Sequence, residues 1–195
     1  MSRYKILSVA MLMLLAVGAQ AATYTIDATH SAVTFKVKHM MVSNVRGSFQ
    51  DFAGSFEYEE GKTNDWTVEA EIQTTSVFTG DEKRDDHLRN EDFFDVANHP
   101  TMTFKSTGMV HDDDDEYILK GELTMLGVTK AMEFEVEFNG SVVDPWGNTR
   151  VGWEAEGEID RKDFGMKFSS SMDNGGLVVG NTIKIELEIE GILQK

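Results

Sequence analysis

The sequence predicts an all-β protein: a single closed antiparallel β-barrel of about eight strands, with a short helix near residues 79–90. Apolar and polar residues alternate with a period of two in segment after segment, turn-forming residues separate these segments, and one stretch lacks the alternation. Alternation is typical of antiparallel strands with one buried face, because strands of a parallel sheet are covered on both faces. A barrel is favoured over a sandwich because it encloses volume and has no exposed edges.

The alternation begins after residue 22 and returns along the chain. Val33, Phe35 and Val37 alternate with polar neighbours in the first clear strand, and apolar residues alternate again over residues 183–189. The other predicted strands cover residues 49–58, 66–72, 102–110, 117–126, 132–138 and 151–159. The turn signals between strands are Glu60-Gly61, Asp112 to Glu116, Asn139-Gly140 and Pro145 to Asn148. Because no internal repeat or linker interrupts this series, residues 22–195 are predicted to form one domain.

The stretch over residues 79–90 has no strand periodicity and is predicted to be helical. Thr79, followed three residues later by Glu82, resembles a helix capping box. Asp85 and Arg89 have the spacing of an intrahelical ion pair. We expect this helix to lie across the barrel. Its apolar contacts would be Leu88, Phe93 and Phe94.

Residues 1–21 have the layout of a cleaved signal peptide. Arg3 and Lys5 precede an apolar run over residues 6–17, which is shorter than the roughly 20 residues of a membrane-spanning helix. Small residues at Ala19 and Ala21 predict cleavage after Ala21. The alternative is an uncleaved N-terminal anchor. We expect an exported protein without a stable membrane anchor.

The composition excludes several kinds of chemistry. The chain has no cysteine, which removes disulfides, thiol catalysis and thiolate metal sites. The formal net charge is −16, and it becomes −18 without the leader, since 18 minus 2 basic residues then face 34 acidic ones. Such a surface repels nucleic acid and anionic membrane faces. The acidic run Asp112 to Glu116 lacks the alternating ligands and central glycine of a calcium loop, and it predicts a solvated turn.

The histidines do not predict a metal site. No two of the five histidines have the three- or four-residue spacing of a helical zinc site. A Gly-x-Ser-x-Gly elbow, a phosphate loop and a dinucleotide fingerprint are also missing from the sequence. An enzyme would need converging acid and base groups, and His39 with Asp85 is the pair that the sequence offers. No catalytic activity and no cofactor are therefore expected.

His39 continues the inward face formed by Val33, Phe35 and Val37. A buried imidazole without a partner costs free energy. His39 is therefore expected either to bond to a backbone carbonyl or carboxylate, or to contact the headgroup of a ligand.

Cations gather over residues 83–89 of this acidic chain, directly before two phenylalanines. This segment suggests the mouth of the barrel, with Arg84, Asp85 and His87 joining His39 as candidate contacts to a headgroup. The alternative is a solvated helix held by intrahelical ion pairs.

Several segments together resemble the YceI-like family. They are Asp27 to His39, Arg84 to Asp95, Gly121 to Thr124 with Gly127 to Lys130, and Asp163-Phe164-Gly165. The likeness extends through the whole mature chain. The resemblance implies a periplasmic, lipocalin-like barrel that binds polyisoprenoid chains or related amphiphiles and has no established catalytic activity.

The residue pattern and the resemblance lead to one expectation for residues 22–195. The lumen is expected to hold a long-chain amphiphile, such as an isoprenoid or isoprenoid quinone, for transport, storage or scavenging. Small inward residues are expected to leave lumen volume; they are Ala70, Gly121, Ala155 and Gly157. The expected apolar wall consists of Val33, Phe35, Val37, Phe93, Phe94, Phe104, Leu123, Phe134, Trp153 and Phe164.

Three alternatives stay open. An enzyme could act on a lipid or quinone in the same pocket. A structural β-module would instead have a filled core at native packing density. The chain could act as a monomer or as a homodimer.

Overall fold

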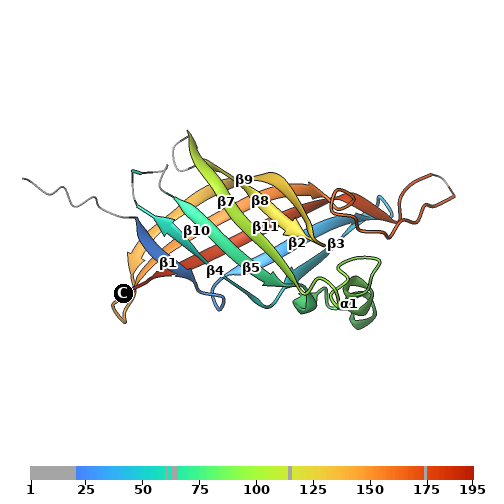
Figure 1. Cartoon of the computed structure of the whole chain (residues 1–195), viewed down its shortest axis with the longest axis horizontal. Coiled ribbons are helices and arrows are strands. Elements are labelled where there is room, and N and C mark those ends of the chain that lie inside the picture. Colours follow the sequence, from blue (N-terminus) through green and yellow to red (C-terminus); the bar gives the residue numbers. More distant parts are fainter. Residues whose placement is uncertain (1–20, 60, 63–65, 114–115, 174) are drawn as a thin grey trace, which may run out of the picture.

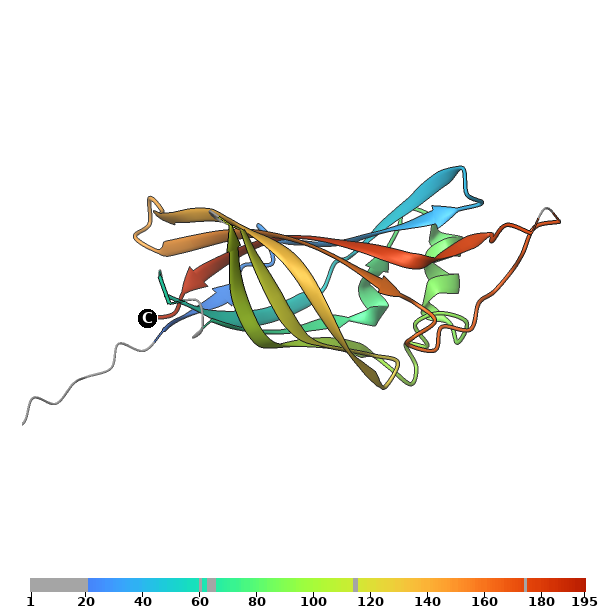
Figure 2. The same cartoon turned by 90° about the horizontal axis from the view of Figure 1, so that it is seen from above.

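Eight passes of the chain close into one antiparallel barrel in the computed structural model (Figures 1 and 2). The structure describes residues 21–59, 61–62, 66–113, 116–173 and 175–195. Residues 1–20 of the predicted signal peptide therefore lie outside the described residues. Three interrupted passes comprise β1 (Ala22–Ile26) with β2 (Ala32–His39), β3 (Ser43–Phe49) with β4 (Phe52–Tyr58), and β5 (Thr67–Gln73) with β6 (Val77–Phe78). The five continuous passes are β7 (Thr101–Asp113), β8 (Glu116–Met125), β9 (Val128–Val143), β10 (Thr149–Asp160) and β11 (Val179–Leu193).

The passes follow chain order around the barrel, and the last one closes on the first. One edge of β11 pairs with β10 over its length, and the other edge pairs with β2 and then with β1. The predicted closed antiparallel barrel is therefore confirmed. The predicted strand over residues 49–58 is wrong in one detail, because Gln50 and Asp51 separate β3 from β4.

The helix α1 (Glu82–Arg89) forms as predicted and lies at one end of the barrel (Figure 1). Its N-cap is Asp81 rather than Thr79, because Asp81 Oδ1 accepts a 2.9 Å hydrogen bond from the backbone N of Arg84. Arg89 pairs with Asp86 at 3.1 Å and not with Asp85 as predicted. Among the described residues, no helix combines the length and the apolar character needed to cross a membrane.

Aromatic rings lie against glycines on the inner wall. A Cβ atom at Gly121 would lie 2.3 Å from Cζ of Phe104, and one at Gly157 would lie 2.8 Å from Cδ1 of Phe134. The prediction that these two glycines leave open volume is therefore wrong, since phenylalanine rings cover them. The glycines instead allow the rings to lie close to the wall.

Candidate functional site

An apolar cavity of about 480 Å³ lies inside the barrel. Ligand pockets in proteins have volumes of roughly 300–1,000 Å³, so this cavity has room for a ligand. The small residues Ala70 and Ala155 line it, as expected. Nine of the predicted apolar wall residues also line it: Val33, Phe35, Val37, Phe93, Phe94, Phe104, Leu123, Phe134 and Trp153.

Two predicted site residues do not reach the cavity wall. Phe164 is buried in the core, but β10 ends at Asp160 and places Phe164 in the following turn, away from the cavity lining. Asp85 is buried as well, and its Oδ1 accepts hydrogen bonds from Thr79 N at 2.9 Å and Thr79 Oγ1 at 2.5 Å. Because Asp85 is engaged with the segment before the helix, it does not join His39 in the cavity, and the predicted acid/base pair is not formed.

The basic residues of the cavity wall gather at the helix end of the barrel. His39 ends β2, Arg84 and His87 belong to α1, and Arg161 directly follows β10. Lys38 also lines the cavity beside His39. The basic residues that line the cavity therefore all lie at this end, and we call it the mouth.

Arg161 organises the mouth and is 1% exposed. Its guanidinium donates to the backbone O of Gly180 at 2.9 Å and of Phe168 at 2.7 Å, with a longer bond of 3.3 Å to Val179 O. Burial lowers the pKa of Arg161. Sequence analysis missed this residue, although the inward alternation of β10 through Ile159 places position 161 on the same face.

The two mouth histidines have different surroundings. His87 Nε2 lies 3.1 Å from Asp92 Oδ2, and the His87 ring meets Phe93 and Phe168 edge-on at 5.0 and 5.3 Å. The ring of His39 lines the cavity but makes no hydrogen bond or ion pair within the described part of the chain. Of the two roles expected for His39, a hydrogen bond to a backbone carbonyl or a carboxylate is therefore not found among the described residues.

Aromatic side chains close the barrel away from the mouth. The Trp153 ring packs against Trp66 and Tyr58 at centroid distances of 5.2 and 5.3 Å, and against Phe138 at 4.7 Å. Trp66 Nε1 donates to Glu59 O at 2.7 Å, whereas Trp153 Nε1 is buried and has no hydrogen-bond partner among the described residues. The cavity is thus cationic at one end and aromatic at the other.

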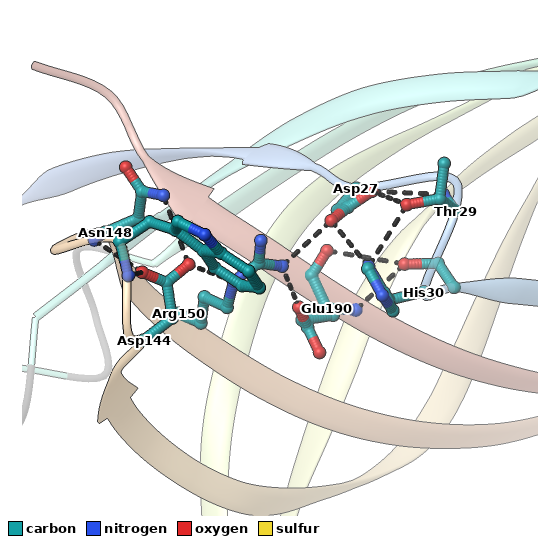
Figure 3. Close-up of polar contacts among 9 residues, drawn as sticks. Asp27, Thr29, His30, Asp144, Asn148, Arg150 and Glu190 are labelled. Atoms are coloured by element: carbon teal, nitrogen blue, oxygen red, sulfur yellow. Dashed lines mark hydrogen bonds and ion pairs between the residues drawn. The ribbon is translucent and has the colours of Figure 1, made fainter.

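A second polar cluster lies on the outer wall where the barrel closes (Figure 3). Arg150 of β10 contacts Asp144 Oδ2 through Nε at 2.8 Å and Asp27 Oδ2 through Nη1 at 2.9 Å. Nη1 also donates to Glu190 of β11, and His30 Nδ1 lies 2.8 Å from Asp27 Oδ2. The cluster therefore connects β10, β11 and the break between β1 and β2, and we call it the seam.

The contacts within the seam shift the pKa values of Asp27, Asp144 and Arg150. Hydrogen bonds from Thr29, His30 and Arg150 hold the pKa of Asp27 far below its usual range. The Arg150 guanidinium likewise lowers the pKa of Asp144, and hydrogen bonds to Asp144, Asp27 and Glu190 raise the pKa of Arg150. The carboxylates of Asp27 and Asp144 are thus stabilised in their charged form.

Part of the seam also has the geometry of a metal site. One ligand atom each of Asp27, His30 and Glu190 lies within 4.8 Å of the others. Arg150 already donates to the carboxylates of Asp27 and Glu190. A cation bound there would be close to the guanidinium charge, so the geometry favours an ion-pair network over a metal site.

Comparison with known proteins agrees with the fold. The model of the YceI-like domain matches residues 24–191. Protein YceI of Escherichia coli O157:H7 is 40% identical over 191 residues, covering 97% of this chain and 96% of the relative. The crystal structure of Burkholderia cenocepacia BcnA superposes with a TM-score of 0.75 at 20% identity, covering 85% of this chain and 98% of that one.

A second similar structure is a polyisoprenoid binding domain from Saccharophagus degradans that is implicated in plant cell wall breakdown. Its TM-score is 0.65 at 14% identity, and the match covers 90% of this chain and 100% of that one. This likeness shows a common fold. From the matched domain and the relative that covers nearly its full length, this chain belongs to the YceI-like family.

Proposed function

We propose that this chain is an exported periplasmic protein that holds one long-chain amphiphile, an isoprenoid or isoprenoid quinone, in the barrel lumen. The observation that carries the proposal is the cavity of about 480 Å³, whose wall is mostly apolar and whose cationic groups gather at the mouth. The apolar tail would lie along the lumen toward Trp153 and Trp66. The oxygen atoms of a headgroup would meet Lys38, His39, Arg84 and His87.

Burial of the tail is sufficient for useful affinity. Each buried methylene contributes roughly 0.8 kcal/mol, so about ten tail carbons give a gross gain near that of micromolar binding. Association costs reduce this gain, and contacts at the mouth add to it. Affinity can therefore come from the tail, while the mouth selects the headgroup.

Two lines of support come from outside the cavity. The structural neighbour from Saccharophagus degradans is a polyisoprenoid binding domain, which favours an isoprenoid among apolar tails. The layout of residues 1–21 favours export through a cleaved signal peptide. The bound lipid would then be transported, stored or scavenged in the periplasm.

The rival functions have less support. A structural module would fill its interior, whereas this barrel contains an open cavity. An enzyme would need catalytic groups at the reacting atoms, and Asp85 is turned away from the cavity toward Thr79. His87 with Asp92 is a remaining acid/base pair near the mouth, at 3.1 Å.

Mass spectrometry of the mature protein tests this proposal. The protein would be purified without detergent, and its organic extract compared with that of the same protein after denaturation and delipidation. We expect about one amphiphile with a long apolar tail per barrel, chemically intact after incubation. A barrel that carries no lipid and shows no saturable binding of an isoprenoid quinone or polyprenyl phosphate would contradict the proposal. Conversion of the added lipid would favour the enzyme.

A further inference from the structure

The β2–β3 hairpin differs in charge from the rest of the protein. No aspartate or glutamate occurs over residues 28–50, although the chain contains 34 acidic residues. The same stretch carries Lys36, Lys38 and Arg46. The hairpin is therefore a basic element on an acidic protein.

The tip of this hairpin exposes apolar side chains. Met41 is 62% exposed and Val42 is 85% exposed, and Met40 beside them is 43% exposed. The backbone φ angles of Met40 and Met41 are 48° and 64°, in the left-handed region that favours glycine or asparagine. The sequence thus keeps large apolar side chains at a strained turn where smaller polar residues would fit better.

The hairpin tip stands at the mouth of the cavity. Lys38 and His39, which lead into the tip, both line the cavity. The backbone N of Met40 donates to Val178 O at 2.9 Å, and Val178 is also part of the cavity wall. Figure 2 shows the β2–β3 hairpin projecting at the same end of the barrel as α1. Any surface that contacts the tip therefore lies next to the opening.

Part of the positive charge on the hairpin is uncompensated. Lys36 forms an ion pair with Glu186 at 2.7 Å. Lys38 and Arg46 form no ion pair within the described ranges, although Glu186 lies close enough to Arg46 to interact with it electrostatically. Phe78 adds a further exposed apolar side chain, 53% exposed and paired with Ser48 of β3.

We propose that the β2–β3 hairpin docks the mouth of the barrel on an anionic phospholipid surface. Met41 and Val42 would enter the boundary between headgroups and acyl chains, and Lys38 and Arg46 would contact lipid phosphates. The acidic remainder of the protein is repelled by the same surface, so contact is brief and one orientation is favoured. Passage of lipid between membrane and lumen rests on the proposed function, whereas docking itself does not.

Vesicle binding by the full mature protein tests the docking surface. The probes are vesicles of phosphatidylcholine with about one third phosphatidylglycerol, compared with phosphatidylcholine alone, at low and high salt. We expect binding to the anionic vesicles, weakened by salt because the phosphate contacts are screened. Met41→Ser/Val42→Ser should lower the partition coefficient about tenfold or more, since two apolar side chains no longer leave water.

Matched variants separate the hairpin from general effects. Val142→Ser/Val143→Ser changes the other exposed apolar hairpin, where these residues are 63% and 65% exposed, and should leave the partition coefficient unchanged. Arg46→Glu should lower it about fivefold or more. Lys120→Glu changes the net charge by the same amount on β8, where Lys120 pairs with Glu133, and should have a much smaller effect.

Three outcomes would overturn the docking proposal. The first is that the protein does not bind anionic vesicles, and the second is that the variants of both apolar hairpins lose vesicle binding to the same extent. The third is that analytical ultracentrifugation finds a dimer that dissociates in Met41→Ser/Val42→Ser, because the β2–β3 tip would then be buried between two copies. Lipid affinity is measured separately with a soluble short-chain isoprenoid in the absence of vesicles, where Met41→Ser/Val42→Ser should bind as the wild type does. If vesicle binding is lost and the isoprenoid affinity is retained, the proposed function is unaffected. If the isoprenoid binds no form of the protein, the result contradicts the proposed function and not the docking proposal.

Discussion

The seam and the mouth are each organised by one arginine, but the two arginines have opposite surroundings. Arg150 on the outer wall contacts the carboxylates of Asp27, Asp144 and Glu190. Arg161 at the mouth donates mainly to backbone carbonyls, and its charge is met at longer range by Asp160. One arginine is surrounded by excess negative charge, and the other keeps its positive charge beside the cavity.

The two arginines therefore have different roles, one in closing the barrel and the other beside the binding cavity. The seam connects the first and last strands on the outer wall, where the charge of Arg150 is balanced by carboxylates of neighbouring segments. At the mouth, carbonyl oxygens satisfy the guanidinium donors without neutralising them. No carboxylate of the described residues contacts the Arg161 guanidinium, so its charge is not neutralised by a contact ion pair.

Arg161→Met is expected to have the largest effect on stability. The variant removes the buried guanidinium that donates to the carbonyls of Gly180 and Val179, whereas Phe168 O keeps its hydrogen bond from Lys162 Nζ at 2.7 Å. We expect a loss of about 3 kcal/mol in the free energy of unfolding, measured by urea denaturation. Lys167→Met is the control, because the Lys167 side chain is 65% exposed, and it should change stability by less than about 0.5 kcal/mol. Equal losses in the two variants would refute a central role for Arg161.

Arg150→Met is expected to have a smaller effect that depends on pH. In the native protein, the lowered pKa values of Asp27 and Asp144 contribute stability above their ordinary pKa of 3.8, and this contribution is lost as the pH falls below that value. Without Arg150, the carboxylates of Asp27, Asp144 and Glu190 repel one another at neutral pH, and this repulsion decreases when they are protonated. The thermal midpoint should fall by a few degrees at pH 7, and the gap to the wild type should shrink toward pH 3. A gap that is constant with pH would mean that Arg150 acts by packing alone.

His39→Phe is expected to alter ligand preference more than stability. Because the His39 ring has no partner among the described residues, the substitution should change the free energy of unfolding by less than about 0.5 kcal/mol. Affinity should fall selectively for a ligand with a polar headgroup and stay unchanged for a plain hydrocarbon with the same tail. Titrations with such a ligand pair measure this, and a variant unchanged in both preference and stability would remove His39 from the site.

Chelation is expected to have the smallest effect. Arg150 already engages two of the three groups that could ligate a metal at the seam. Treatment with EDTA should therefore leave the thermal midpoint and ligand affinity unchanged, and elemental analysis should find no stoichiometric metal after dialysis. A retained metal that is lost in Asp27→Asn would show that His30 and Glu190 form a true metal site.

The sequence predicted the barrel well because alternation reports directly which face of a strand is buried. It did not predict that the first three passes are interrupted after Ile26, Phe49 and Gln73. The strand β3 also escaped prediction because Asn44, Arg46 and Gly47 dilute its apolar pattern.

The apolar wall was largely predictable, and the polar contacts were not. Inward alternation places seven predicted side chains on the cavity wall, and the segment after the helix adds Phe93 and Phe94, but neither pattern tells which hydrogen bonds form between segments. From the sequence, the Asp85 side chain could point either into the cavity or toward Thr79, and in the structure it accepts a hydrogen bond from Thr79. Arg161 was missed for another reason: an arginine that follows a strand is usually solvated, and its burial here depends on the carbonyls of Phe168, Val179 and Gly180, which the sequence does not place beside it.

Binding in the lumen is tested most directly by a large side chain that points from one strand into the cavity. Ala70 of β5 lines the cavity, and the adjacent Glu71 points to the exposed outer face. Ala70→Phe should place its ring in the space of the tail and weaken binding of an isoprenoid quinone by tenfold or more. Glu71→Phe, which adds the same ring outside the barrel, should bind as the wild type does. Equal affinity of the wild type and both folded variants would contradict binding in the lumen.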